Sequence, residues 1–285
     1  HKCVLGAASE LERLGFTVHR LSVEKDGTID LNFIDELASE KTALVSAMHA
    51  NNENGVIHPI KEIGEICQKN GAIFHTDAAQ SFGKIEIDVD EQNIDLLSIS
   101  GHKIYAPKGI GALFIRDEVK EKLLPISFGG GQEAEIRSGT LATSLCVGLG
   151  SASEIAQKEM RRDQKKIEKQ RDKFLSILKR LAPFICLNGP KTNRLYNNLN
   201  ICFSGISSQD LLACIHSQVS ASAGSACTSG FIEPSHVLSS MGLNPDQIES
   251  SLRFGFGRGL STHLTNLAAQ IIGTEAQRLK NYKKG

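Results

Sequence analysis

Short apolar runs alternate with amphipathic stretches along the first half of the chain. Runs rich in β-branched residues predict strands, and apolar residues three or four positions apart predict helices. These patterns predict strands at 17–21, 42–48, 72–75, 95–100 and 111–115, and helices at 3–14, 31–40 and 59–69. Such alternation is typical of βα units that build a mainly parallel sheet. We therefore expect residues 1–150 to form a large α/β domain.

A long charged stretch divides this pattern from a second one. Residues 154–180 place apolar side chains at helical spacing among many charges, which predicts an amphipathic helix that connects two lobes. The remainder predicts strands at 184–187, 199–203 and 252–256, and helices at 208–218, 234–241 and 263–282. Residues 151–285 are therefore expected to form a linker helix and a smaller C-terminal α/β domain.

Composition and charge argue against several classes of protein. The 285 residues include 32 Lys and Arg and 32 Asp and Glu, so the chain has no net charge with which to attract nucleic acid or an anionic membrane. No apolar run reaches the roughly 18 residues that span a bilayer. The seven cysteines contain no C-x-x-C pair, which argues against a zinc site or a disulfide framework. We expect a cytoplasmic protein with no metal site.

Polar residues follow three of the predicted strands, at the edge where open α/β sheets bind ligands. They are Asp77, Gln80, Asn52 and Lys103. A lysine buried at a strand end is costly unless it is paired, neutral or covalently engaged, and a desolvated lysine suits Schiff-base chemistry. A carboxylate in the same cleft can keep the ring nitrogen of pyridoxal phosphate protonated. On these residues alone, a cofactor lysine and an ordinary solvated or salt-bridged lysine both remain open.

Five sequence blocks resemble one known family. They are 75–80 (His-Thr-Asp-Ala-Ala-Gln), 98–111, 137–140 (Arg-Ser-Gly-Thr), 224–235 and 251–255. In this order they closely resemble the cysteine desulfurases, which are pyridoxal phosphate enzymes of aminotransferase class V and fold type I. Block 224–235 begins Gly-Ser-Ala-Cys-Thr-Ser-Gly and resembles the sulfur-accepting loop of the branch that serves iron–sulfur cluster assembly.

The resemblance implies a role for each residue that matches the family. Lys103 would bond covalently to the cofactor, and Asp77 would pair with the nitrogen of its ring. Asn52 and Gln80 would donate hydrogen bonds to the ring oxygen. His1 would stack on the ring and is a candidate acid or base in the proton transfers.

The same resemblance implies ligands for the cofactor phosphate and for the substrate. Ser100 and His102 match phosphate ligands, and Thr140 matches a ligand that reaches the site of the neighbouring subunit. A homodimer is therefore expected. Arg253 would bind the substrate carboxylate, as the geometry of a guanidinium group favours, and Asn52 would contribute to the substrate site.

Cys227 lies in a stretch of small residues, 221–230, which favours an accessible thiol on a loop. The resemblance makes it the nucleophile that removes sulfur from L-cysteine as a persulfide and leaves L-alanine. The sulfur would then pass to an acceptor, either a scaffold protein for iron–sulfur clusters or a thiolation enzyme. The other six cysteines fall in predicted helices and strands and are interpreted as structural.

Two alternatives to a working desulfurase stay open. Family members carry a sizeable segment before the residue that matches His1, so we expect that segment to be missing. A truncated, catalytically impaired copy that acts only as a binding subunit is one alternative, and a selenocysteine lyase is another. A class V aminotransferase is disfavoured, because transamination needs no small-residue loop around Cys227. In a eukaryote, the expected location becomes the mitochondrial matrix.

Overall fold

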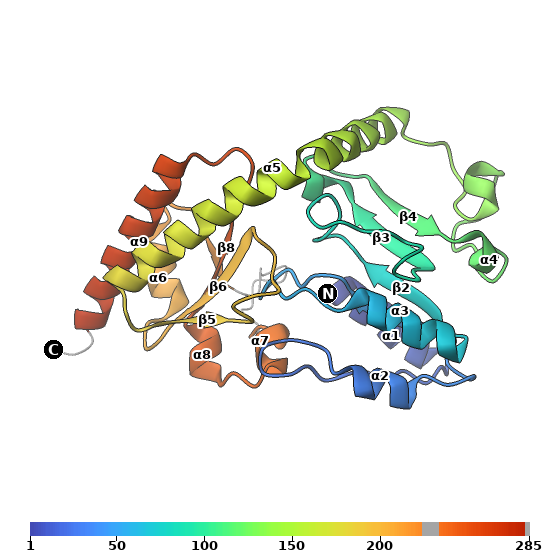
Figure 1. Ribbon diagram of the computed structural model, residues 1–285, viewed down its shortest axis with the longest axis horizontal. Helices are drawn as coiled ribbons and strands as arrows, with labels where there is room; N and C mark the ends of the chain where they lie inside the picture. Colours follow the sequence, from blue (N-terminus) through green and yellow to red (C-terminus); the bar gives the residue numbers. More distant parts are fainter. Residues whose placement is uncertain (224–233, 283–285) are drawn as a thin grey trace.

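The computed structural model describes residues 1–223 and 234–282, which form two lobes joined by one long helix (Figure 1). The large lobe contains α1 (Lys2–Arg13), α2 (Leu31–Leu37), β1 (Leu44–Met48), α3 (Ile60–Asn70), β2 (Ile73–Asp77), β3 (Leu96–Ser100), the three-ten helix η1 (Gly101–Ile104), β4 (Gly111–Ile115), α4 (Asp117–Lys120) and the three-ten helix η2 (Gln132–Glu135). The small lobe contains β5 (Ile185–Asn188), β6 (Asn198–Phe203), α6 (Ser208–Ile215), β7 (Ser222–Ala223), α7 (His236–Ser240), α8 (Pro245–Glu249), β8 (Ser251–Gly255) and α9 (Thr262–Tyr282). The long helix is α5 (Thr143–Leu181).

The sheet of the large lobe has the strand order β1-β2-β3-β4. Strands β1, β2 and β3 run parallel, and β4 is antiparallel to β3. The register pairs Asp77 with Met48 on one side and with Ser98 on the other, so the carboxyl ends of the parallel strands meet at one edge. The expected mainly parallel sheet is confirmed.

The core of the large lobe lies between this sheet and α3. Phe74, Ile63 and Ile94 are fully buried there, and burial of each contributes about 1.5–3 kcal/mol. Helix α3 begins directly after Pro59 and ends at Gly71, whose left-handed φ of 71° stops the helix. The two residues therefore set the length of the helix that packs on β2.

The sheet of the small lobe has the strand order β5-β6-β8-β7, and every neighbouring pair is antiparallel. Helices α5 and α9 lie side by side over one face of it (Figure 1). Leu199, Ile201 and Phe203 alternate along β6 into the core beneath these helices. Asn198 and Asn200 therefore point to the opposite face, where they reach the large lobe.

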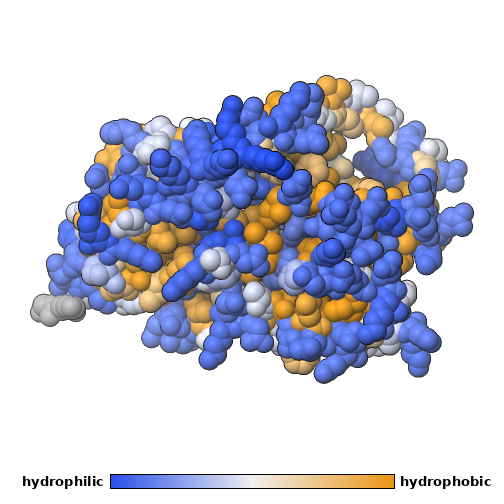
Figure 2. All heavy atoms as spheres, in the orientation of Figure 1, coloured by the Kyte–Doolittle hydropathy of each residue, from blue (hydrophilic) through white to orange (hydrophobic). Residues whose placement is uncertain are grey.

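Helix α5 is 39 residues long and belongs to both lobes. Its first half packs Ala152 and Ala156 against Ile104 of the large lobe, and its second half buries Phe174 in the small-lobe core. Figure 2 shows charged and polar side chains over its middle, where it crosses between the lobes. The domain boundary expected at residue 150 falls inside this continuous helix. In residues 1–223 and 234–282, no helix has the length and apolar character of a membrane span.

One expected strand and one helix pattern are wrong. Residues 17–21 form no strand: most of their side chains are exposed, and the nearest pairing is an isolated bridge between Val23 and Ile29. The apolar run there meets no neighbouring strand in the described part of the chain. The helix expected at 234–241 is shorter in the structure, where α7 covers His236–Ser240. A second short helix, α8, follows it and begins with a capping box between Asn244 and Gln247. Five residues are too few for periodicity to predict such a helix.

Candidate functional site

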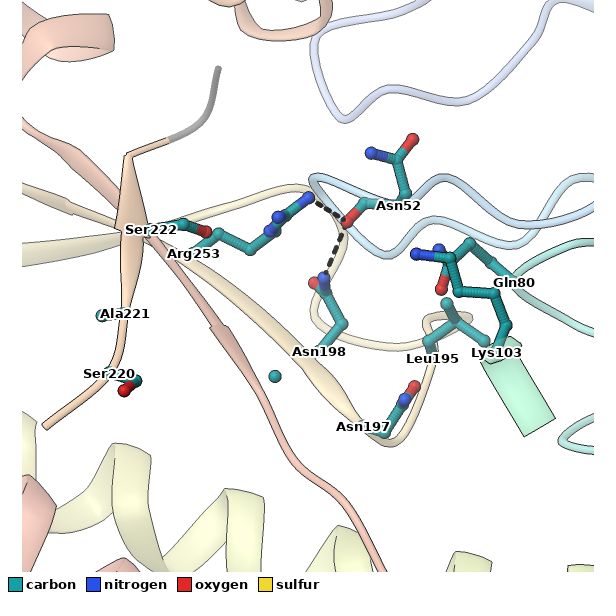
Figure 3. Close-up of a pocket in the computed structure, with 11 residues that line it drawn as sticks. Asn52, Gln80, Lys103, Leu195, Asn197, Asn198, Ser220, Ala221, Ser222 and Arg253 are labelled. Carbon is teal, nitrogen blue, oxygen red and sulfur yellow. Dashed lines mark hydrogen bonds between the residues drawn. The ribbon is translucent and has the colours of Figure 1, made fainter. Parts of the chain in front are cut away.

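A cavity of about 400 Å³ is lined by residues of both lobes, within the range of pockets that hold small ligands and cofactors. Asn52, Gln80 and Lys103 come from the large lobe, and Asn198 and Arg253 come from the small lobe (Figure 3). The remaining lining residues are Leu195, Asn197, Ser220, Ala221, Ser222 and Gly255. Three residues that the sequence places after strand ends, Asn52, Gln80 and Lys103, thus meet Arg253 of the small lobe in one space.

Lys103 lies in η1, the single three-ten turn that directly follows β3. The turn carries the lysine away from the sheet, so its side chain is exposed at the cavity. The lysine therefore lies at the carboxyl edge of the sheet, and its exposure leaves the cofactor role a prediction.

A second lysine, which the sequence analysis did not single out, lies behind the site. The Nζ atom of Lys84 donates a hydrogen bond to the backbone oxygen of Gln80, 2.8 Å away. Burial lowers the pKa of Lys84 to about 8, and the positive charge of Lys103 adds to that effect. Its spacing of four residues from Gln80 was the only signal in the sequence.

The remaining strand-end residues of the large lobe gather at the same edge. Asp77 is the last residue of β2 and is nearly buried, and its Oδ1 atom accepts a hydrogen bond from the N–H of Ala79. Ser100 ends β3, and its Oγ atom lies 3.2 Å from Nδ1 of His102 in η1. The ends of β2 and β3 and the turn η1 therefore present a carboxylate, a hydroxyl and an imidazole at the sheet edge that carries Lys103.

The loop after β1 carries Asn52 and is anchored in the small lobe. Asn51 starts the loop, because its side-chain oxygen accepts hydrogen bonds from the N–H groups of Glu53 and Asn54. The backbone oxygen of Asn52 then accepts hydrogen bonds from Arg253 Nη1 at 3.2 Å and Asn198 Nδ2 at 3.3 Å (Figure 3). Arg253 is thereby fixed with its other N–H groups still able to meet an anion.

Glu53 is a buried carboxyl group beside the cavity that sequence reasoning missed. It is 7% exposed, and Ser235 Oγ donates a hydrogen bond of 2.5 Å to its Oε2 atom. Burial raises the pKa of Glu53, and the hydrogen bond from Ser235 opposes that shift. The Glu53 backbone oxygen accepts a hydrogen bond from Asn200 Nδ2 at 3.2 Å, so this residue also joins the two lobes.

Two buried histidines close the base of the same loop. The N–H of His58 donates to the backbone oxygen of His49 at 2.9 Å, and the two residues are 6% and 3% exposed. Within the part of the chain that the structure describes, their Nδ1 atoms find no hydrogen-bond partner. Burial lowers the pKa of each histidine to about 4, so both rings are neutral at pH 7.

This pair predicts a loss of stability in mild acid. The unfolded chain takes up protons on both histidines below pH 6.5, whereas the folded chain does not until about pH 4. Each histidine therefore costs on the order of 3 kcal/mol of unfolding free energy at pH 4. Between pH 7 and pH 4.5, the free energy of unfolding measured in urea should fall less steeply with pH for His58→Gln than for the parent chain. The exposed His19→Asn should fall as steeply as the parent. Equal slopes for all three chains would contradict the assignment.

Five of the described residues that the sequence singled out do not line this cavity: His1, Asp77, Ser100, His102 and Thr140. Thr140 is exposed and does not line the cavity. His1 is also exposed and caps α1, where its Nδ1 atom accepts a hydrogen bond from the N–H of Cys3. Cys227 lies outside the described residues. The roles expected of all these residues therefore stay predictions.

Comparisons with known proteins agree on one family. The aminotransferase class-V model matches residues 1–262. A probable mitochondrial cysteine desulfurase of Dictyostelium discoideum is 48% identical over 99% of this chain, which covers 62% of that protein. The cysteine desulfurase IscS of Rickettsia bellii is 46% identical over 99% of this chain, which covers 68% of that protein. The chain therefore spans only part of the length of these relatives.

Solved structures show the same likeness in three dimensions. A NifS-like protein matches with a TM-score of 0.88 and 29% identity, covering 99% of this chain and 73% of that one. A structure described as SspA in complex with cysteine matches with a TM-score of 0.76 and 37% identity, covering 90% of this chain and 71% of that one. The expected fold of type I is thereby confirmed. The chain belongs to the aminotransferase class-V family, in its cysteine desulfurase branch.

Proposed function

We propose that this chain acts as a pyridoxal phosphate-dependent cysteine desulfurase, which converts L-cysteine to L-alanine and transfers the sulfur to Cys227. One observation carries the proposal: Lys103, Gln80, Asn52 and Arg253 converge on one cavity in a member of this branch. The named relatives are cysteine desulfurases, and one neighbouring structure contains cysteine. The names therefore favour cysteine over selenocysteine as the substrate.

The residues around the cavity fit the proposed cofactor. Lys103 is exposed at the cavity for a covalent bond, and Asp77 supplies a nearly buried carboxylate at the neighbouring strand end. Gln80 offers an amide to a ring oxygen, and the Ser100–His102 pair offers donors to a phosphate. When bound, pyridoxal phosphate supplies an electron-accepting ring that stabilises negative charge at the substrate Cα atom.

The side chains divide the proposed reaction between binding, proton transfer and sulfur transfer. Arg253 binds the substrate carboxylate while its contact with the Asn52 oxygen holds the guanidinium in place. The Lys103 amine takes the proton from Cα and later returns a proton to the product. The Cys227 thiolate attacks the substrate sulfur: the S–S bond forms, the Cβ–S bond breaks, and the carbon keeps the electron pair and is protonated to L-alanine.

A homodimer is part of the proposal. Thr140 lies away from the cavity of its own chain, as a residue that serves the site of a neighbouring subunit would. Large apolar side chains of the segment before η2 are strongly exposed, with Leu124 at 87%, Ile126 at 98% and Phe128 at 82%. Such clustering is typical of a protein–protein contact. The sulfur acceptor, and a location in the cytoplasm or mitochondrial matrix, stay predictions.

Replacement of Arg253 should weaken substrate binding more than the chemical step. A charged hydrogen-bonded pair contributes about 1.5–3 kcal/mol, so Arg253→Gln should raise KM for L-cysteine roughly 10- to 100-fold. Steady-state alanine formation measures this effect, with the exposed Arg278→Gln of α9 as the matched control. An unchanged KM would contradict the assignment of Arg253 to the substrate carboxylate.

The proposed function is tested by supplying the chain with pyridoxal phosphate and measuring alanine and sulfide. L-cysteine should give both products in the presence of a thiol that accepts the sulfur, and D-cysteine should give neither. L-selenocysteine serves as a third substrate, because a much larger kcat/KM for it would favour a selenocysteine lyase. Binding of cofactor without product from either substrate would favour a chain that acts only as a binding subunit.

A further inference from the structure

We propose that Arg258, together with Tyr105 and Asp163, is a positioning residue for Lys103. The three side chains join the turn that carries Lys103 to helix α5 and to the segment that leads from β8 into α9. The inference rests on the proposed function, because it assigns these contacts a purpose in aligning Lys103 with Arg253.

The backbone of Tyr105 is the first observation. Tyr105 caps η1 two residues after Lys103, and its φ of 70° is left-handed. A side chain with a Cβ atom adopts that conformation at a cost, so the surrounding contacts must fix it. Its N–H donates to the Gly101 oxygen and closes the turn around Lys103. The geometry of Tyr105 therefore shapes the turn itself.

Arg258 makes the contacts that fix this tyrosine. The backbone N–H of Arg258 donates to Tyr105 Oη at 2.9 Å, and the Arg258 guanidinium lies 5.2 Å from the centre of the Tyr105 ring. The preceding residue is Gly257, where a Cβ atom would come within 3.1 Å of Tyr105 Oη. One residue thus engages both the polar end and the face of the ring.

Helix α5 anchors Arg258 from the other side. Asp163 is 5% exposed, and its Oδ2 atom accepts a hydrogen bond from Arg258 Nε at 2.5 Å. Lys166 Nζ donates to the Arg258 backbone oxygen at 3.1 Å. Asp163 follows Ala156 by seven residues, so the two share one face of the helix, and Ala156 packs on Ile104 of η1. The turn, the helix and the β8–α9 segment therefore form a closed set of contacts.

This arrangement relates the two proposed reacting groups to one another. Lys103 lies two residues before Tyr105, and Arg253 lies five residues before Arg258, at the centre of β8. Lys103 comes from the large lobe and Arg253 from the small lobe. The distance between their side chains therefore depends on the nearby contacts that bridge the two lobes. Loss of the Arg258 contacts should loosen the turn and misplace the Lys103 amine relative to a carboxylate bound at Arg253.

Four variants test the proposal: Tyr105→Phe, Tyr105→Gly, Arg258→Lys and Asp163→Asn. Tyr105→Gly is the sharpest, because glycine adopts the left-handed conformation without strain while the ring contacts disappear. The exposed Arg162→Lys, on α5 beside Asp163, is the matched control. Urea unfolding of every variant separates loss of stability from loss of alignment.

The first readout is amide hydrogen exchange over residues 101–106 in the chain without cofactor. We expect exchange there to rise about tenfold in Tyr105→Gly, which removes every ring contact, and by a smaller factor in Arg258→Lys, Tyr105→Phe and Asp163→Asn, with no rise in Arg162→Lys. The second readout is alanine formation, where kcat should fall about tenfold or more in Tyr105→Gly while KM for L-cysteine changes less than threefold.

Two results would overturn the inference: unchanged exchange in Tyr105→Gly and Arg258→Lys, or a kcat loss that merely follows the loss of urea stability. If the parent chain forms no alanine, the proposed function fails. The exchange experiment then still tests whether Arg258 fixes the turn.

Discussion

Lys103→Ala should lower alanine formation by roughly 10³-fold or more while the folded chain keeps its stability. The side chain is exposed at the cavity and does not contribute to the core, so its removal should leave urea unfolding unchanged. The loss follows because the same amine would hold the cofactor and move the proton at the substrate Cα atom. Steady-state alanine assays at saturating pyridoxal phosphate measure it.

Two controls sharpen this experiment. Lys108→Ala removes an exposed lysine five residues later and should be silent. An added small primary amine should restore part of the activity of Lys103→Ala, because it supplies the missing proton carrier without a covalent bond to the chain. Full activity in Lys103→Ala, or a similar loss in Lys108→Ala, would contradict the role proposed for Lys103.

Cys227→Ser should stop sulfur transfer while cofactor binding stays intact. A serine hydroxyl is a much weaker nucleophile toward sulfur than a thiolate, so alanine and sulfide formation should fall by roughly 10³-fold. The visible absorbance of bound pyridoxal phosphate should still change on addition of L-cysteine, because substrate binding precedes the attack. Mass spectrometry after L-cysteine should find a persulfide on the 227-containing peptide of the parent chain only.

Cys186→Ser is the matched control for this variant, because Cys186 is an exposed thiol on the edge strand β5. We expect parent-like rates from it. A persulfide that stays abundant in Cys227→Ser, or rates that fall equally in Cys186→Ser, would assign the nucleophile elsewhere.

Local patterns were sufficient to predict most of the large lobe. The apolar runs that became β1, β2 and β3 are short and end in polar residues, and parallel pairing then brings those ends together without further information. This is why Asp77 and Lys103 could be placed at one edge of the sheet from the sequence. The same patterns failed at residues 17–21, because an apolar run becomes a strand only where a neighbour offers hydrogen bonds.

The rest of the site depends on contacts between residues far apart in the chain. Asn198 reaches the Asn52 oxygen across 146 residues, and Glu53 meets Ser235 across 182, so no local pattern shows either pair. The exposure of Lys103 follows from a single three-ten turn, which leaves no periodic signal. Sequence blocks predicted which residues matter, and the fold shows how Arg253 is oriented.

The most direct test of a desulfurase site at Lys103 is the visible spectrum of the chain with pyridoxal phosphate. The spectrum is recorded before and after addition of L-cysteine, and alanine is measured in the same sample. We expect a visible band that borohydride fixes on the peptide containing Lys103, and alanine that accumulates in proportion to that band. Absence of the band at saturating cofactor, or attachment at Lys84 or Lys108 instead, would contradict a desulfurase site built around Lys103.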